Sequence, residues 1–513
     1  MSPTTSGEFS FTVALEDEQA TGRLMADIAG LIDPGDLITL SGDLGAGKTA
    51  FARAFIRHIA GDEEIEVPSP TFTLIQTYDL ARFPVVHADL YRIGDASELD
   101  ELGFSDAPET AVTLLEWPDR AGGQLPRDRL DIAFTLSPPQ GESFRHAEIT
   151  GYGSFAPRAA RIAAIRHFLN ESGFGLATRR RIQGDASTRS YERLMRDGTS
   201  YILMNSPRRP DGPPVRDGKP YSQIAHLAET VTPFIAMARG LRMLGLSAPA
   251  IYAADRDAGL LVLEDLGNEV IVEGDPPAPI EERYEIAADL LAALHHERTP
   301  DTLNVESGVQ YRVPRYDMDA MLIETELLLD WFLPLLGSTP DDDVRDEYIT
   351  LWRAALAPAL TSQQTWVMRD YHSPNIIWLP ERDGINRIGL LDFQDAMMGS
   401  PAYDVASLLQ DARVSVPEMM EISLLSRYTR ARMKAEPGFD APAFARLYAT
   451  FAAQRASKIL GIFARLDRRD GKPQYLRHLP RVWTYLQRSL AHPDLAELAA
   501  WYRANIPVPK VKS

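Results

Sequence analysis

The chain contains no cysteine, which excludes disulfide bonds, thiolate metal sites and cysteine nucleophiles among its 513 residues. It also has no apolar run that approaches the roughly 20 residues of a membrane-spanning helix. Its first residues, MSPTTSGEFSFTV, lack the basic and apolar regions of a secretion signal. We therefore expect a cytoplasmic protein that makes no use of a membrane.

Basic residues are scarce in the first third of the chain. Residues 1–155 contain 26 Asp and Glu against 10 Lys and Arg, a balance of −16, whereas the rest of the chain has a balance of only −3. Proteins bind a phosphodiester backbone through Lys and Arg, which displace its counterions. If the first part serves RNA, we expect it to do so indirectly, through a protein partner.

The length and the hydrophobic content of 45% predict two or three domains. We place the boundary near residue 155, where an alternating segment ends in a Gly/Ser/Pro cluster and a basic amphipathic helix begins. The first domain, 1–155, alternates strands and helices. The second, 156–513, reads as a small strand-rich lobe to about residue 268 and a helical lobe over about 269–513.

A glycine-rich loop, SGDLGAGKT, stands between an expected strand at 36–40 and an expected helix at 48–60. Its pattern G-x-x-x-x-G-K-T suits the β/γ-phosphates of a nucleotide, since backbone N–H groups and a helix N-terminus surround the anion. Lys48 adds a positive charge, and Thr49 offers a hydroxyl to Mg²⁺. We predict that ATP contacts Gly42, Asp43, Leu44, Gly45, Ala46, Gly47, Lys48 and Thr49.

Two carboxylates end apolar runs later in the same domain. Asp89 follows VVHA and Glu116 follows VTLL, so both should lie at the carboxyl edge of a sheet beside the phosphates. We expect Asp89 to face the metal and Glu116 the attacking water. The turn VPSPTFTL resembles a switch segment that senses the γ-phosphate through Ser69 or Thr71.

The segments GDLGAGKT, VPSPTFTL, HADLYR and LLEWPDR together resemble the TsaE family over nearly all of residues 8–152. This is the P-loop ATPase family of the machinery that makes N6-threonylcarbamoyladenosine in tRNA. The resemblance implies that ATP hydrolysis here would cycle a complex of partner proteins, with carbamoyl transfer occurring on a partner. It also implies site roles for Lys48, Thr49, Thr71, Asp89, Glu116 and Trp117.

A second phosphate-handling pattern lies in RDYHSPNIIWLPERDGINRIGLLDFQDA. Asp370 and Asn375 are five residues apart, and Asp392 ends an apolar strand seventeen residues later. This is the spacing of kinase-like sites, in which Asp370 would accept the substrate proton while Asn375 and Asp392 hold Mg²⁺. We expect Asp404 to cap the helix that begins there and His295 to be a packing or hydrogen-bonding support.

Residues 156–513 resemble the aminoglycoside phosphotransferase and choline kinase superfamily. GDASTRSY, LLVLEDLGN, RDYHSPNI and QRASKILGIFARLDRRDGKPQYL are similar to its AmgK group, which phosphorylates the anomeric hydroxyl of N-acetylmuramate and N-acetylglucosamine in cell-wall sugar recycling. The resemblance implies a loop over the ATP phosphates at 184–189 and a hinge beside adenine at 264–266. The residues it marks for the nucleotide are Gly184, Ser187, Thr188, Arg189, Glu264 and Leu266.

The second domain departs from this superfamily at two places. The strand that commonly carries a phosphate-binding lysine offers Met204 and Asn205, so either Arg189 or another basic residue binds the phosphates or catalysis is weak. The histidine that commonly stands before the catalytic Asp is replaced as well, since Met368 and Arg369 precede Asp370. Arg455 and Lys458, three residues apart, could meet a substrate carboxylate or belong to a solvated face.

We predict an α/β P-loop NTPase domain followed by a two-lobed α+β protein-kinase-like domain of the aminoglycoside phosphotransferase type. The cofactors would be ATP and Mg²⁺, and the partners would be the other proteins of the threonylcarbamoylation complex and an amino sugar. Two alternatives stay open for the second domain. It could be an aminoglycoside or small-alcohol kinase, or a non-catalytic nucleotide-binding scaffold.

Overall fold

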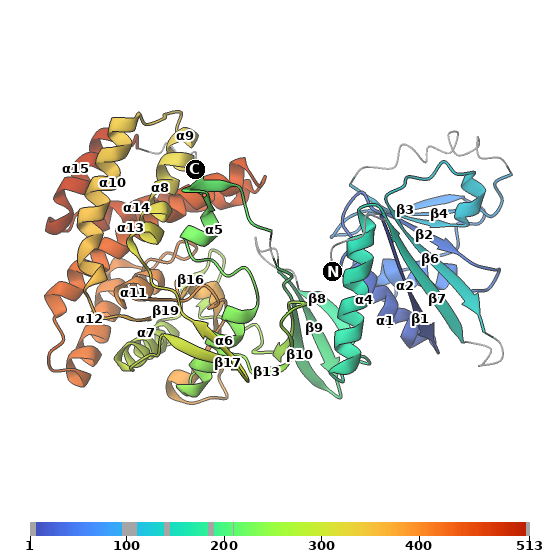
Figure 1. Ribbon diagram of the computed structural model, residues 1–513, viewed down its shortest axis with the longest axis horizontal. Coiled ribbons are helices and arrows are strands. Elements are labelled where there is room, and N and C mark those ends of the chain that lie inside the picture. The colour runs from blue at the N-terminus through green and yellow to red at the C-terminus, as the bar shows by residue number, and fades with distance from the viewer. Residues whose placement is uncertain (1–6, 95–109, 138–143, 183–188, 209, 509–513) are drawn as a thin grey trace. The chain divides into compact units, whose positions relative to one another are not determined.

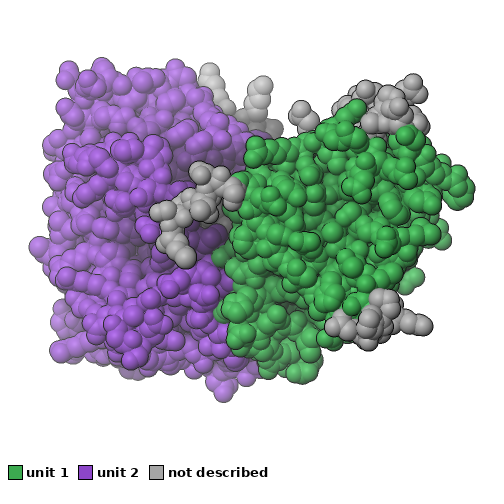
Figure 2. All heavy atoms as spheres, turned by 45° about the vertical axis from the view of Figure 1, so that its right-hand side comes forward, with its two compact units in different colours: residues 1–205 green, residues 206–513 purple. Residues whose placement is uncertain are grey.

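The computed structural model describes residues 7–94, 110–137, 144–182, 189–208 and 210–508. It divides into two compact units, residues 1–205 and 206–513 (Figure 2). The boundary predicted near residue 155 therefore falls inside the first unit. Within the described ranges, no helix has the length and apolar character to cross a membrane.

The first unit is built on a seven-stranded sheet in the order β1-β7-β6-β2-β5-β4-β3. Strands β6, β2, β5 and β4 are parallel neighbours, and β1, β7 and β3 are added antiparallel. Strands β2, β4 and β5 are almost wholly buried, as strands covered on both faces require, whereas β6 alternates buried and partly exposed residues. The strand bounds are β1 (Glu8–Leu15), β2 (Leu37–Ser41), β3 (Ile75–Tyr78), β4 (Val85–Asp89), β5 (Val112–Glu116), β6 (Arg129–Leu136) and β7 (Arg145–Tyr152).

Helices α1 (Glu18–Ala29), α2 (Lys48–Ala60) and α4 (Phe155–Glu171) share one hydrophobic core with this sheet. Figure 1 shows α4 running alongside β7 and β1. The close approach needs Gly151 in β7, because a Cβ there would lie 2.4 Å from the carbonyl oxygen of Phe155.

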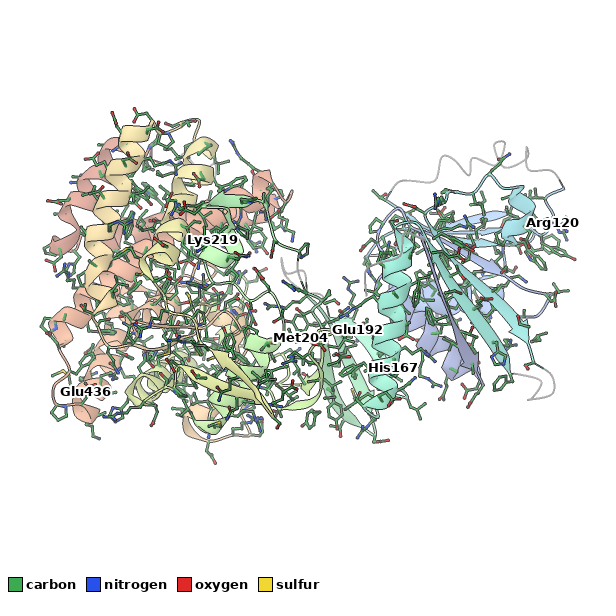
Figure 3. All side chains as sticks on the ribbon, viewed as in Figure 1. Arg120, His167, Glu192, Met204, Lys219 and Glu436 are labelled. Carbon is green, nitrogen blue, oxygen red and sulfur yellow. The ribbon has the colours of Figure 1, made fainter. Side chains whose placement is uncertain are left out.

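Three further strands of the first unit follow α4 and are antiparallel to one another: β8 (Thr178–Ile182), β9 (Ser190–Arg196) and β10 (Thr199–Asn205). They fit the small strand-rich lobe that the sequence predicts up to about residue 268. In Figure 3, Glu192 is labelled on β9 and Met204 on β10.

The second unit is mostly helical, as expected from about residue 269 onward. Its longest helix, α13, is buried along most of its length and packs against α8, α11 and α14. Helix α8 ends at Leu327 and continues into a π-helical turn at Leu328–Phe332. The helix bounds are α5 (Tyr221–Ile224), α6 (Thr232–Met243), α7 (Glu281–His296), α8 (Met318–Leu327), α9 (Leu333–Leu335), α10 (Asp342–Leu356), α11 (Ala402–Leu409), α12 (Glu418–Ala435), α13 (Ala441–Arg468), α14 (Leu479–Leu490) and α15 (Ala496–Asn505).

Apart from β13 and β14, which belong to a five-stranded sheet, the strands of the second unit form short antiparallel pairs. Two of these pairs carry the predicted kinase-like site: β19 with β22, and β20 with β21. The strand bounds are β11 (Pro214–Arg216), β12 (Lys219–Pro220), β13 (Ile251–Asp255), β14 (Leu260–Glu264), β15 (Val272–Glu273), β16 (Ala278–Pro279), β17 (Thr302–Glu306), β18 (Val309–Arg312), β19 (Thr365–Val367), β20 (Ile376–Trp378), β21 (Ile388–Leu390) and β22 (Met397–Gly399).

Candidate active sites

The glycine-rich loop joins β2 to α2, where the sequence predicts it. Gly42 has φ +128°, and a Cβ at this position would lie 2.3 Å from the carbonyl oxygen of Phe134, so only glycine fits. Helix α2 begins at Lys48 with no side-chain cap at Gly47. Its first N–H groups are therefore left for an anion, which fits the phosphates of a nucleotide.

Lys48 is buried, and its ammonium group is held by its own loop. Nζ donates to the carbonyl oxygens of Gly42 at 2.7 Å and Asp43 at 3.0 Å, and it lies 3.7 Å from the centre of the Trp117 ring. Burial lowers the pKa of Lys48, while the nearby carboxylates, Glu116 first, oppose this shift. The neutral carbonyl groups are weaker partners for an ammonium than a phosphate is, so a bound nucleotide would compete for it.

Glu116, at the end of β5, is buried and held from two sides. Its Oε2 accepts a hydrogen bond from Thr49 Oγ1 at 3.0 Å, and its Oε1 lies 2.9 Å from His87 Nε2. His87 is fully buried in β4, and our sequence analysis missed it. The signal was available, because His87 stands two residues before Asp89 and thus on the same face of its strand.

Asp89, at the end of β4, meets the predicted switch turn. Its Oδ2 accepts from Thr71 Oγ1 at 2.7 Å and from Ser69 Oγ at 3.4 Å. Asp89 pairs in register with Glu116 on the neighbouring parallel strand, so both carboxylates lie at the same sheet edge. The predicted switch turn therefore contacts the carboxylate that we expect to face the metal.

These groups surround a cavity of about 380 Å³. Most predicted contact residues line it, including Thr71 and Trp117. Arg53, Tyr91 and Arg145 line it too and were not predicted. The full lining is Leu44, Gly45, Gly47, Lys48, Thr49, Ala50, Arg53, Ser69, Thr71, Asp89, Tyr91, Glu116, Trp117 and Arg145.

The kinase-like site follows the short strands of the second unit. Asp370 stands three residues after β19, and Asn375 Nδ2 donates to its carbonyl oxygen at 2.9 Å. Asp392 follows β21 in a left-handed conformation, with φ 57°, and its Oδ1 accepts from Gln394 Nε2 at 2.7 Å. The backbone N–H of Leu391 donates to Asn375, so the structure brings the segments of Asn375 and Asp392 together.

Among the described residues, no group of three His, Cys, Asp or Glu side chains is arranged to hold a metal ion by itself. Mg²⁺ is commonly held by one or two protein ligands and by the phosphates of the substrate. The oxygens of Asn375 and Asp392 at one end of a short hairpin suit such a site.

Asp404 supports the loop that contains Asp370, but it does not cap its own helix as the sequence suggested. Its carboxylate accepts from the backbone N–H groups of Met368 at 2.6 Å and Arg369 at 3.0 Å. The start of α11 has no side-chain cap. The backbone just before Asp370 offers two orphan donors in a fully buried place, which explains why the carboxylate turns there. Burial raises the pKa of Asp404 to about 7.

Arg369, at the position where histidine was expected, is a buried structural residue. It forms an ion pair with Glu324 of α8 and donates to the carbonyl oxygen of Ala225 at 3.1 Å. His295 is also fully buried, and its Nδ1 lies 2.9 Å from the hydroxyl of Tyr428. The support role expected for His295 agrees with this position.

The carboxylate of Asp370 is partly exposed, with a third of the side chain open to solvent. Burial acts to raise its pKa, but Lys458, His372 and Arg455 outweigh this effect, and the pKa of Asp370 is lowered. The group is therefore ionised near neutral pH, as a proton acceptor must be.

The nucleotide contacts expected in the second domain are only partly described. Gly184, Ser187 and Thr188 lie outside the described residues, and Arg189 is half-buried immediately before β9. Leu266 packs against Ile377 and Leu379. The carboxylate of Glu264 is already used, by Arg382 at 2.6 Å and by the N–H of Ala250 at 3.0 Å, so any contact with adenine would come from its backbone.

Comparison with known proteins shows two family matches. The model of the TsaE threonylcarbamoyl adenosine biosynthesis protein matches residues 15–143, and that of the phosphotransferase enzyme family matches residues 178–437. The chain belongs to both families. The TsaE match and the phosphotransferase match confirm the resemblances and the fold class predicted from the sequence.

The relatives of the phosphotransferase part include the N-acetylmuramate/N-acetylglucosamine kinase of Caulobacter vibrioides, which is 41% identical over 361 residues. That alignment covers 68% of this chain and 97% of the relative. The TsaE protein of Rickettsia bellii is 36% identical over 122 residues, which are 24% of this chain and 84% of the relative. A solved choline/ethanolamine kinase family protein from Mesorhizobium loti is 16% identical to this chain, with a TM-score of 0.42. The alignment covers 68% of this chain and 99% of the solved protein.

Proposed function

We propose that the chain is a bifunctional protein with two separate ATP sites. Its TsaE part would hydrolyse ATP in support of N6-threonylcarbamoyladenosine formation in tRNA. Its phosphotransferase part would transfer phosphate from ATP to the anomeric hydroxyl of N-acetylmuramate or N-acetylglucosamine. Both activities consume ATP, and we propose the cytoplasm as their location.

The observation that carries the kinase proposal is the ionised carboxylate of Asp370 in a pocket that also contains Arg455 and Lys458. In the reaction, Asp370 would accept the proton of the sugar hydroxyl as its oxygen attacks the γ-phosphorus. Asn375 and Asp392 would hold Mg²⁺, which supplies neutralisation of phosphate charge. Asp404 keeps the loop of Asp370 in place through the two backbone N–H groups before it.

The proposal also has to name a residue that binds the ATP phosphates in place of the missing strand lysine. Asn205, in the strand where the lysine was expected, accepts a hydrogen bond from Arg161 Nε of helix α4 at 3.0 Å, and Met204 is buried. Neither residue carries a charge for a phosphate. We propose that Arg189, which ends the predicted phosphate loop, takes this role.

In the TsaE part, Lys48 would bind the β/γ-phosphates, Thr49 and Asp89 would face Mg²⁺, and Glu116 would orient water. Thr71 donates a hydrogen bond to Asp89 in the structure, so loss of the γ-phosphate beside Asp89 would change the contacts of the switch turn. The acidic charge of residues 1–155 favours partner proteins over direct contact with tRNA.

The kinase proposal is tested by incubating the full chain with ATP and each amino sugar and recording the phosphorus NMR spectrum of the product. A phosphate at the anomeric carbon couples to the anomeric proton. A phosphate at the 6-hydroxyl would show that the regiochemistry is wrong. Turnover of aminoglycosides or small alcohols, with none of amino sugars, would show that the substrate class is wrong.

The partner proposal is tested with the same full chain in a gel-shift experiment at physiological salt. We expect no retardation of tRNA by the chain alone, and retardation only after the other proteins of the threonylcarbamoylation complex are added. Direct, salt-sensitive binding of tRNA by the chain alone would contradict an indirect role.

A further inference from the structure

A second cavity, of about 130 Å³, lies beside the carboxylate of Asp370 in the second unit. One of its walls is the middle of helix α13, which contributes Arg455 and Lys458 to the lining. His372, Asp411 and Arg413 contribute from the catalytic loop and from the segment after α11. The sequence left open whether the two basic residues of α13 meet a substrate or solvent.

Lys458 is already paired inside the protein. Its Nζ lies 2.8 Å from Oε1 of Glu324, a fully buried carboxylate that Arg369 also contacts. This pairing outweighs the effect of burial and raises the pKa of Lys458 to about 12. Its charge therefore stabilises the core around Glu324 and is poorly placed to select a substrate.

Arg455 is equally buried, with 4% of its surface exposed, but its situation is different. In the ranges that the structure describes, its guanidinium forms no hydrogen bond or ion pair with another side chain, and its Nε is buried without a partner. The centre of the Tyr403 ring lies 5.9 Å from the guanidinium carbon of Arg455. A buried guanidinium without an anion is unfavourable, so an anionic group of a ligand would stabilise Arg455 in this position.

The carboxylates that Arg455 influences electrostatically, or with which it shares the cavity, have other roles or partners. Asp404 accepts the N–H groups of Met368 and Arg369. Asp411 accepts from the N–H of Ser373 at 2.9 Å and from its hydroxyl at 2.6 Å. Asp370 is the proton acceptor of the proposed reaction. Among the described residues, no carboxylate therefore serves only as the partner of Arg455. The side chain of Arg455 lines the cavity beside Asp370, where the substrate of the proposed reaction would bind.

We propose that Arg455 binds the carboxylate of the lactyl ether of N-acetylmuramate and so sets the preference between the two amino sugars. The inference rests on the proposed kinase function. The two sugars differ only in this lactyl group, whose carboxylate is the anionic group of N-acetylmuramate. A guanidinium offers that carboxylate two parallel hydrogen bonds, which an ammonium does not.

The test compares kcat/KM of the full chain for both sugars in the natural protein and in Arg455→Met. The ratio of kcat/KM for N-acetylmuramate to that for N-acetylglucosamine should fall about 10²-fold, mainly through KM of the acidic sugar. Arg455→Lys keeps the charge and should recover part of the ratio. Equal losses on both sugars, or an unchanged ratio, would overturn the inference.

Lys458→Met is the matched control, one turn along the same helix face. It removes the partner of Glu324, so it should lower thermal stability and activity on both sugars alike, with the ratio preserved. A change of the ratio in Lys458→Met but not in Arg455→Met would assign the carboxylate to Lys458 instead.

Calorimetric binding of N-acetylmuramate to the full chain without ATP separates this inference from the proposed function. Binding that Arg455→Met weakens about 10²-fold supports the carboxylate site even if turnover is slow. If N-acetylglucosamine is phosphorylated but N-acetylmuramate is not bound, the kinase proposal stands and the role of Arg455 is wrong. If neither sugar binds or reacts, both proposals fail.

Discussion

Arg179 in strand β8 forms an ion pair with Asp27 in helix α1 of the TsaE domain. Arg179 is the second residue of the phosphotransferase family match, so this pair joins sequences from the two families. It is almost fully buried, and Arg166 of helix α4 contacts the other oxygen of Asp27 at 2.7 Å. Glu192 of β9 completes the cluster, 2.8 Å from Arg179 Nε.

This buried cluster ties the first strands of the phosphotransferase match to the TsaE domain. These contacts agree with a first compact unit that extends beyond residue 155. Separating strands β8 and β9 from helices α1 and α4 would expose these buried charges or leave them without partners. The junction is therefore part of the fold of the first unit.

Asp27→Asn tests this junction. The amide leaves the guanidinium groups of Arg166 and Arg179 without their shared anion, so the free energy of unfolding should fall by about 3 kcal/mol. Urea unfolding of the full chain measures it. Asp119→Asn, at an exposed position of the TsaE domain, should leave the midpoint unchanged. Equal midpoints for Asp27→Asn and the natural chain would mean that the cluster does not stabilise the unit.

His87 should act as a positioning residue for Glu116 through their 2.9 Å contact. His87→Phe should lower kcat of ATP hydrolysis roughly 10²-fold with little change in KM, because the nucleotide contacts of Lys48 and Thr49 persist. The double variant His87→Phe/Glu116→Gln should lose little more kcat than Glu116→Gln alone, because both substitutions remove the same His87–Glu116 contact. Full additivity of the two losses would show that His87 acts independently of Glu116.

Asp370→Asn and Asp392→Asn should have different effects on the kinase. The first removes the proton acceptor and should cut turnover by roughly 10² or more, with the affinity for ATP·Mg²⁺ nearly intact. The second removes a charge that would face Mg²⁺ and should weaken Mg²⁺-dependent nucleotide binding as well. Nucleotide titrations of both variants decide the assignment, and the opposite pattern would exchange the two roles.

The buried histidines predict how stability depends on pH. Burial holds the pKa of His295 well below 6.5 and lowers the pKa of His478 to about 4. The unfolded chain then binds more protons than the folded chain below pH 6.5, so stability is fully present above 6.5 and is lost as the pH falls towards 4.

His295→Gln should flatten this loss by up to about 1.4 kcal/mol for each pH unit below 6.5. Free energies of unfolding, measured in urea between pH 8 and pH 5, give the slope. His296, the exposed neighbour, is the matched control, and His296→Gln should leave the slope unchanged. An unaltered slope in His295→Gln would mean that His295 is not the titrating group.

Much of this architecture could be predicted from the sequence, because its signals are local. The glycine loop, the strand ends at Asp89 and Glu116, and the spacing of Asp370, Asn375 and Asp392 each belong to one short segment. The helix expected at 48–60 matches α2, whose bounds are Lys48–Ala60. Parallel strand pairing then brings Asp89 and Glu116 together, as expected for carboxyl ends of neighbouring strands.

The remaining features depend on contacts between distant segments. Asp404 looked like a helix cap because it stands in the first turn of a helix, but its partners are backbone donors 35 and 36 residues earlier. Lys458 and Arg455 have the same charge and nearly the same burial, and only Glu324, far away in sequence, distinguishes them. No spacing rule in a single sequence reports such pairs.

Lys48→Ala in the full chain tests most directly whether the two ATP sites of this chain work on separate chemistry. Both ATP hydrolysis without sugar and formation of sugar 1-phosphate would be measured on the same preparation. Loss of the lysine that faces the β/γ-phosphates should abolish the hydrolysis and leave sugar phosphorylation unchanged. Loss of both activities in a protein of normal thermal stability would contradict two independent sites.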